Sequence, residues 1–178
     1  MNKKLKKLKR FTTASFAIWP FDPEKDSKRI HSRIIIIGLN PAARVKFGEN
    51  FHKEGHQFDR WYKEGFSKSP FTGSYMTDLI SHHEPKSALV VKKWKDKKFK
   101  QRNLRNLRKQ FKILGVKEFT QILCIGYNTE RLFSSSFPEL KHIFKIKHPN
   151  SIRIKNKRNI FLRNLRKVGE KITRRIRK

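Results

Sequence analysis

The sequence predicts an α/β fold of three layers, in which a parallel sheet of four strands lies between two layers of helices. Short apolar runs alternate along the chain with segments of helical periodicity, as in proteins built from βα units. Two of these runs are continuous and rich in β-branched residues, which is typical of strands buried on both faces. Together the two observations favour a parallel sheet with right-handed crossovers.

The four apolar runs are the expected strands. They cover residues 33–39, 74–80, 119–125 and 142–146. The first and third are the continuous runs, so we expect them in the middle of the sheet.

Helices are expected between and after these strands. An apolar face predicts a helix before Gly115, a residue suited to ending it, and a second apolar stripe predicts a basic helix at the end of the chain. A short helix is expected at residues 129–133, and a less regular pattern suggests another at residues 58–66. The first apolar face consists of Phe99, Leu104, Leu107, Phe111 and Leu114, and the second of Phe161, Leu165, Val168, Ile172 and Ile176.

Composition predicts one folded, strongly cationic domain. We expect it over residues 31–178, after a basic lead-in at residues 1–30. The formal net charge is +31, while 36% of the residues are hydrophobic, enough for a packed core beneath a charged surface. Such a surface attracts polyanions, so DNA, single-stranded DNA or RNA is the expected partner. The alternative is a lysine-rich protein that has no role with nucleic acid.

Several classes of protein are disfavoured. Cys124 is the only cysteine, which excludes an internal disulfide and a cysteine-only metal site. No apolar run approaches the ~18–20 residues that a membrane helix needs, and no apolar core follows the basic N-terminus as in a secretory signal. We expect a cytoplasmic monomer that binds no membrane, no metal and no cofactor.

Polar residues follow the predicted strands at their carboxyl ends, where open parallel sheets bind ligands. Gly38-Leu39-Asn40-Pro41 ends the first strand, Asp78 lies in the second, Gly126-Tyr127 follows the third, and His148-Pro149-Asn150-Ser151 follows the fourth. Asn40 and His148 are therefore expected at one edge of the sheet.

The first and last of these turns resemble those of the uracil-DNA glycosylase superfamily. Its members carry a G-x-N-P or G-x-D-P turn after the first strand and an H-P-S-like turn after the last, and this chain has the Asn form. Residues 75–79 resemble the family's Y-x-T-N stretch. The resemblance covers roughly residues 30–155. Together with the βα alternation, it implies the strand order 2-1-3-4.

The resemblance implies a DNA base-excision glycosylase that hydrolyses the N-glycosidic bond of a damaged or mismatched base. Asn40 would position water, His148 would donate to the base oxygen, and Phe51, with Phe47 as runner-up, would stack on the base. Gly38, Leu39, Asp78 and Asn150 would also bind the base, and Ser151, Arg44 and Lys46 would contact phosphates.

The chemistry suits these residue types. Breaking the bond leaves positive charge on the sugar and negative charge on the base, so a donor aimed at the base oxygen stabilises the transition state. The base must leave the stack first, which favours an aromatic platform. Each residue also has an ordinary alternative: Asn40 as a turn residue, His148 as a surface residue and Phe51 as a packing residue.

Asp78 departs from the family pattern. Relatives that excise uracil have Asn there, and an ionised carboxylate only accepts hydrogen bonds, so it would repel uracil O4 unless it is protonated. Ionised Asp78 would better suit an amino group, and a shift of one residue would make Thr77 the base contact instead. A non-catalytic nucleic-acid-binding protein with the same fold is therefore the main alternative, and a nucleotide hydrolase is a third.

Overall fold

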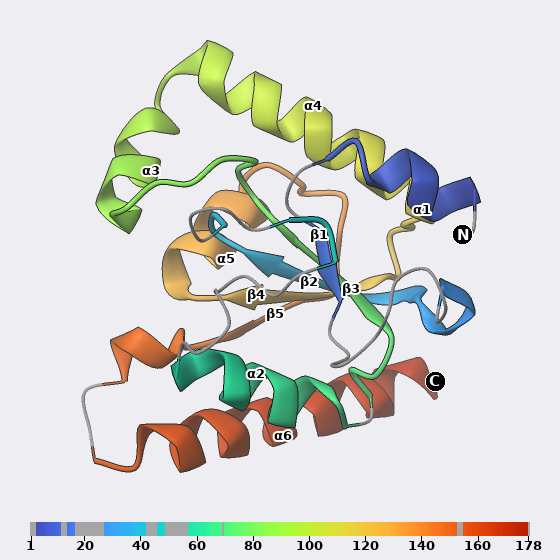
Figure 1. The fold of residues 1–178 in the computed structure, drawn as a ribbon, viewed down its shortest axis with the longest axis vertical. Helices are drawn as coiled ribbons and strands as arrows, with labels where there is room; N and C mark the ends of the chain where they lie inside the picture. Colours follow the sequence, from blue (N-terminus) through green and yellow to red (C-terminus); the bar gives the residue numbers. More distant parts are fainter. Residues whose placement is uncertain are drawn as a thin grey trace.

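A five-stranded sheet in the order β1-β3-β2-β4-β5 forms the centre of the molecule (Figure 1). The computed structural model describes residues 3–11, 14–16, 27–41, 46–48, 57–68, 70–152 and 155–177. The strands are β1 (Ala14–Phe16), β2 (His31–Gly38), β3 (Ser74–Asp78), β4 (Gln121–Ile125) and β5 (Ile143–Ile146).

Strands β2 to β5 run parallel to one another in the order β3-β2-β4-β5. This arrangement confirms the predicted four-stranded parallel sheet of order 2-1-3-4. The structure adds β1, which pairs antiparallel with the outer edge of β3 and brings Ala14 opposite Thr77. A strand of three residues carries no sequence pattern that could have predicted it.

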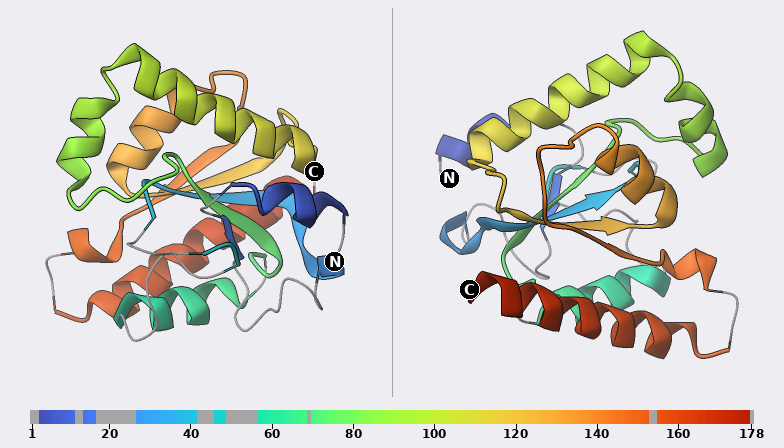
Figure 2. Two further views of the ribbon diagram at one scale, coloured as in Figure 1. Left: turned by 45° about the horizontal axis from the view of Figure 1, so that its top comes forward. Right: turned by 180° about the vertical axis from the view of Figure 1, so that it is seen from behind.

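Helices cover both faces of the sheet (Figures 1 and 2). One layer contains α1, α3, α4 and α5, and the other contains α2 and α6. No helix within the described ranges is long and apolar enough to cross a membrane. The helices are α1 (Lys3–Leu8), α2 (Gln57–Phe66), α3 (Ser87–Lys93), α4 (Lys97–Leu114), α5 (Tyr127–Ser134) and α6 (Lys157–Ile176), with 3-10 turns η1 (Ser27–Arg29) and η2 (Pro149–Ser151).

The central strand β2 is buried on both faces, as its continuous apolar run predicts. Ile35 and Ile37 pack with α4, while Ile34 and Ile36 pack with α2 and α6. All four side chains are fully buried, and each such burial stabilises the fold by about 1.5–3 kcal/mol. The buried sheet therefore supports the turns that follow the carboxyl ends of its strands.

Local signals set the limits of α4. The Asp96 carboxylate accepts a hydrogen bond from the backbone N–H of Phe99 (2.8 Å) and caps the first turn. Gly115 ends the helix in the left-handed region at φ 75°. Both the predicted apolar face and its predicted stop are confirmed.

Helix α2 has a simple reason for its less regular sequence pattern. Phe58, Tyr62 and Phe66 are spaced four residues apart and are buried against the sheet. Gly65 lies on a different side, where a Cβ atom would overlap the side chain of Leu165 in α6. The glycine thus lets α2 and α6 pack closely side by side.

Candidate active site

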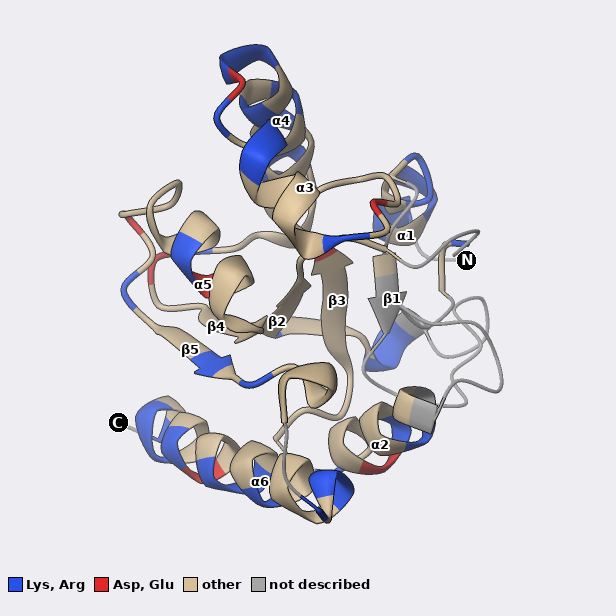
Figure 3. Ribbon diagram, turned by 90° about the vertical axis from the view of Figure 1, so that its left-hand side faces the viewer, with Lys and Arg blue, Asp and Glu red and all other residues tan. Residues whose placement is uncertain are grey.

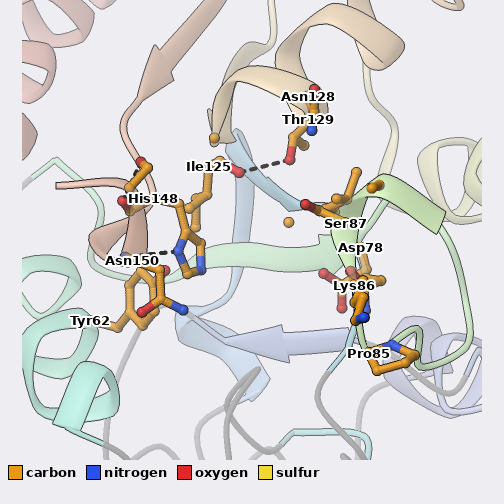
Figure 4. A pocket seen from close by; sticks show the side chains of 16 residues that line it. Tyr62, Asp78, Pro85, Lys86, Ser87, Ile125, Asn128, Thr129, His148 and Asn150 are labelled. Atoms are coloured by element: carbon orange, nitrogen blue, oxygen red, sulfur yellow. Dashed lines mark hydrogen bonds between the residues drawn. The ribbon is translucent and has the colours of Figure 1, made fainter. Parts of the chain in front are cut away.

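A cavity of about 590 Å³ opens at the carboxyl ends of the parallel strands (Figure 4). Backbone turns after three strands and the starts of two helices form its walls. The lining residues are Gly38, Leu39, Asn40, Tyr62, Asp78, Pro85, Lys86, Ser87, Ala88, Ile125, Gly126, Asn128, Thr129, His148, Asn150 and Ser151.

The turn after β2 is held against the chain that follows β3. Backbone N–H groups of Leu79 and Ile80 donate to Gly38 O (2.9 Å) and Leu39 O (3.1 Å), which extends the parallel pairing beyond the strand ends. The Asn40 side chain follows, and its Nδ2 donates to Glu84 O (2.8 Å) and, more weakly, to Pro41 O (3.3 Å). Since Nδ2 is the bonded atom and no described residue donates to Oδ1, the amide presents Oδ1 as an acceptor.

Residues 82–84 form a clamp behind Asn40. The Nδ1–H of His83 donates to Pro41 O (2.9 Å). The Glu84 carboxylate accepts from the Lys93 ammonium and from the Nε2–H of His82 (3.1 Å). The hydrogen bond from Lys93 lowers the pKa of Glu84, so this carboxylate is ionised and anchors the segment that holds Asn40. Sequence analysis missed the clamp, although an acidic residue in so basic a stretch is a usable signal.

The His148 ring is oriented by the turn that follows it. Its Nδ1 accepts a hydrogen bond from the backbone N–H of Asn150 (3.1 Å), and Ser151 Oγ donates to His148 O (2.7 Å). Phe58 contacts the ring edge-on at 6.1 Å between centroids. Because Nδ1 accepts, the neutral imidazole carries its proton on Nε2. Figure 4 shows the ring directed into the cavity.

Asp78 lies across the cavity from His148 (Figure 4). It is the last residue of β3, pairs in register with Gly38, and is 3% exposed. Neither carboxylate oxygen has a hydrogen-bond partner among the described residues. Burial therefore raises the pKa of Asp78 well above its ordinary value.

Thr77, the alternative base contact, faces away from the cavity. Its Oγ1 donates to Gln110 Oε1 (2.9 Å) inside the layer that contains α4, and its side chain is fully buried. Of these two neighbours, only Asp78 lines the cavity.

The end of β4 supplies the wall next to His148. Gly126 has φ 98°, a conformation that favours glycine, and its N–H donates to Ile146 O at the end of β5 (2.8 Å). Thr129 Oγ1 donates to Ile125 O (2.7 Å) in the first turn of α5. This bond fixes the Thr129 side chain at the cavity wall.

Most of the predicted site residues converge, and some do not. Gly38, Leu39, Asn40, Asp78, His148, Asn150 and Ser151 all line the cavity. Lys46 is exposed and is not part of the lining, and Phe47 packs against the core beside α4. Arg44 and Phe51 lie outside the described residues.

Other lining residues were missed by sequence analysis, because they come from elements whose packing the sequence does not show. Tyr62 of α2 and Asn128 and Thr129 of α5 belong to this group, with residues 85–88. Their one signal is Gly126, which marks a turn directly after a buried strand. Within the described ranges, no three His, Cys, Asp or Glu residues lie close enough together to hold a metal ion.

Comparison with known protein families gives one match. Residues 25–168 match the model of the uracil DNA glycosylase superfamily. The matched segment contains the four parallel strands and both turns that carry Asn40 and His148. No curated protein matches the chain.

Proposed function

Because that match covers most of its length, the chain belongs to the uracil DNA glycosylase superfamily, and we propose that it hydrolyses the N-glycosidic bond of a damaged or mismatched base in DNA. One observation carries the proposal. Asn40, Asp78 and His148, which come from three separate turns or strands, line the same cavity. Its volume of about 590 Å³ is ample for a base that has left the helix stack.

The proposed chemistry divides between two side chains. Oδ1 of Asn40 accepts a hydrogen bond from the attacking water and holds it beside the sugar, while the Glu84 carbonyl fixes the amide. The Nε2–H of His148 donates to the base oxygen that gains negative charge as the bond breaks. One copy of the chain supplies both groups, so we propose a monomer that needs no cofactor.

In this proposal Asp78 determines which base binds in the cavity. Its burial without a partner favours the protonated form, which offers one O–H donor and one carbonyl acceptor. An amide offers the same pair, so protonated Asp78 matches the N–H and C=O edge of uracil and of other deaminated bases. The ionised form would only accept. We therefore propose deaminated bases as substrates under conditions where Asp78 is protonated.

The alternative function is nucleic-acid binding without catalysis. The net charge of +31 supports binding to DNA or RNA whether or not a bond is broken. A catalytic assay is needed to separate the two.

The test uses oligonucleotides that carry uracil, hypoxanthine, xanthine or a common mismatch, single-stranded and paired. Heat and alkali reveal abasic sites as strand breaks. We expect breaks at a deaminated base with the parent protein and a loss of them with Asn40→Ala at matched DNA occupancy. Binding without breaks on any substrate would exclude the glycosylase and leave the binding function.

A further inference from the structure

A second, shallower groove lies beside the cavity, between the start of α5, the edge strand β5 and α6. Its volume is about 360 Å³. The groove and the cavity share two stretches of chain. Tyr127 lines the groove between Gly126 and Asn128 of the cavity, and Lys147 of the groove precedes His148. The remaining groove residues are Lys145, Ile146, Asn164, Lys167 and Val168.

Tyr127 presents an unusually open aromatic ring to this groove. It is 65% exposed, although only Gly126 separates it from the buried strand β4. The Lys145 ammonium lies 5.1 Å and the Arg131 guanidinium 6.0 Å from the ring centroid. The φ of 98° at Gly126 turns the chain at this point and sets where Tyr127 emerges. An exposed ring flanked by cations is the combination that stacks bases in single-stranded nucleic-acid sites.

The groove also carries positive charge that the described part of the chain does not neutralise. Lys147 and Lys167 are exposed and make no ion pair with any described residue. Lys145 differs, since its ammonium contacts the Glu130 carboxylate at 3.2 Å. Lys147 and Lys167 are therefore the cations open to phosphate.

We propose that this groove binds the nucleotide adjacent to the one in the cavity, with its base stacked on Tyr127 and its phosphates at Lys147 and Lys167. The inference rests on the proposed function, because it places the strand that leads out of the base cavity. A base stacked on the ring displaces a flexible cation, which is the weaker contact at an exposed site. A base that is paired in a duplex cannot stack on Tyr127, so the groove selects single-stranded substrate.

Binding measurements on Tyr127 variants test the groove. The probes are a short single-stranded oligodeoxynucleotide with one central uracil and the duplex made from it. We expect Tyr127→Ala to weaken single-strand binding by about fivefold or more, the usual effect of losing one stacked base. Tyr127→Phe should keep single-strand binding, and duplex binding should not change with either variant.

Phe119 provides the matched control. It is 64% exposed but precedes β4, at the opposite end of the strands from the cavity, so Phe119→Ala should leave single-strand binding unchanged. The proposed nucleotide site is refuted if Tyr127→Ala has no effect on binding or weakens binding to both substrates equally. It is also refuted if Tyr127→Ala weakens single-strand binding no more than Phe119→Ala does. Binding is measured without turnover, so a selective loss with Tyr127→Ala supports the groove even if no abasic sites form. A selective loss of single-strand binding without any abasic sites would contradict the proposed function but not the groove.

Discussion

The cavity at the strand ends and the helices that cover the sheet differ sharply in charge. Among the described residues that line the cavity, Lys86 is the only lysine or arginine. Helix α4, in contrast, carries eight lysines and arginines and no acidic residue, and α6 carries eight with one glutamate. Figure 3 shows many blue segments along both helices, whereas β2, β3 and β4 are mainly tan.

In the proposed function, this difference separates two tasks of a DNA glycosylase. The proposal has α4 and α6 attract phosphates over a wide surface, which would supply affinity without sequence preference. The cavity has few charged residues, so in the same proposal neutral donors such as the His148 imidazole would act in a low-dielectric site that does not attract phosphates. Affinity and turnover should therefore respond to different substitutions and conditions.

Salt should produce the largest effect, and it should act on affinity. If six or so phosphates are neutralised, affinity falls by about 10³-fold or more between about 50 and 200 mM salt. Titrations of a labelled oligonucleotide at several salt concentrations measure the slope. An affinity that is indifferent to salt would mean that the cationic helices do not contact phosphate.

Removing the His148 donor should act on turnover. We expect His148→Ala to lower the rate of base release by about 10²- to 10³-fold, as loss of an oxyanion-hole donor does. Affinity for DNA should be nearly unchanged, because the donor strengthens its bond only in the transition state. Single-turnover kinetics with saturating enzyme give the rate. Full activity in this variant would remove His148 from the chemistry.

Neutralising the groove should give a smaller loss, again of affinity. With both Lys147 and Lys167 changed to Gln, the slope of log affinity against log salt should fall by about two. The control pair is Lys109 and Lys112, which are exposed near the C-terminal end of α4. The same change at that pair should alter the slope less. Equal changes would mean that the positive charge acts only as a diffuse field.

The smallest expected effect is on stability, at Asp78. Its pKa is raised in the folded state above the ordinary 3.8, so between these two pKa values the folded protein binds more protons than the unfolded chain. Stability is therefore lost as pH rises through that interval. Asp78→Asn removes the loss and should raise the free energy of unfolding at neutral pH by about 1 kcal/mol or more, because an amide has no proton to take up and no charge to bury on folding.

Urea denaturation of the parent and Asp78→Asn at acidic and neutral pH measures this difference. The same variant should keep its activity on uracil as pH rises, whereas the parent should lose activity as Asp78 ionises. Parallel stability curves for the two proteins would show that Asp78 ionises normally in the folded state.

The sheet could be predicted well because strands that are buried on both faces need continuous apolar runs, which are easy to find in a sequence. Ile34 to Ile37 form an uninterrupted β-branched run, and each residue is buried in the structure. The predicted ends of the strands were less accurate. Leu79 and Ile80 are buried but follow the end of β3, and Phe119 is exposed before β4 begins. Hydrophobicity reports burial, whereas backbone pairing defines a strand.

The short elements were not predictable in the same way. Helix α3 has seven residues, and its N-cap Lys86 makes no side-chain capping bond. Helix α1 has six residues, and it forms where Leu5 and Leu8 become buried in the core shared with α4. Both depend on tertiary contacts more than on local propensity.

The candidate site shows the same division. Asn40, Asp78 and His148 could be predicted because parallel strands bring their carboxyl ends to one edge. The Glu84 clamp and Tyr62 could not, because they depend on how loops and helices pack over that edge.

The separation of turnover from affinity is tested most directly at Asn40. The rate of base release and the dissociation constant are measured for the same uracil-containing oligonucleotide, with the parent and with Asn40→Ala. We expect the rate to fall by about 10²-fold or more while the dissociation constant and its salt dependence stay the same. A variant that loses affinity in step with rate, or that releases the base as fast as the parent, would contradict the assignment of chemistry to this cavity.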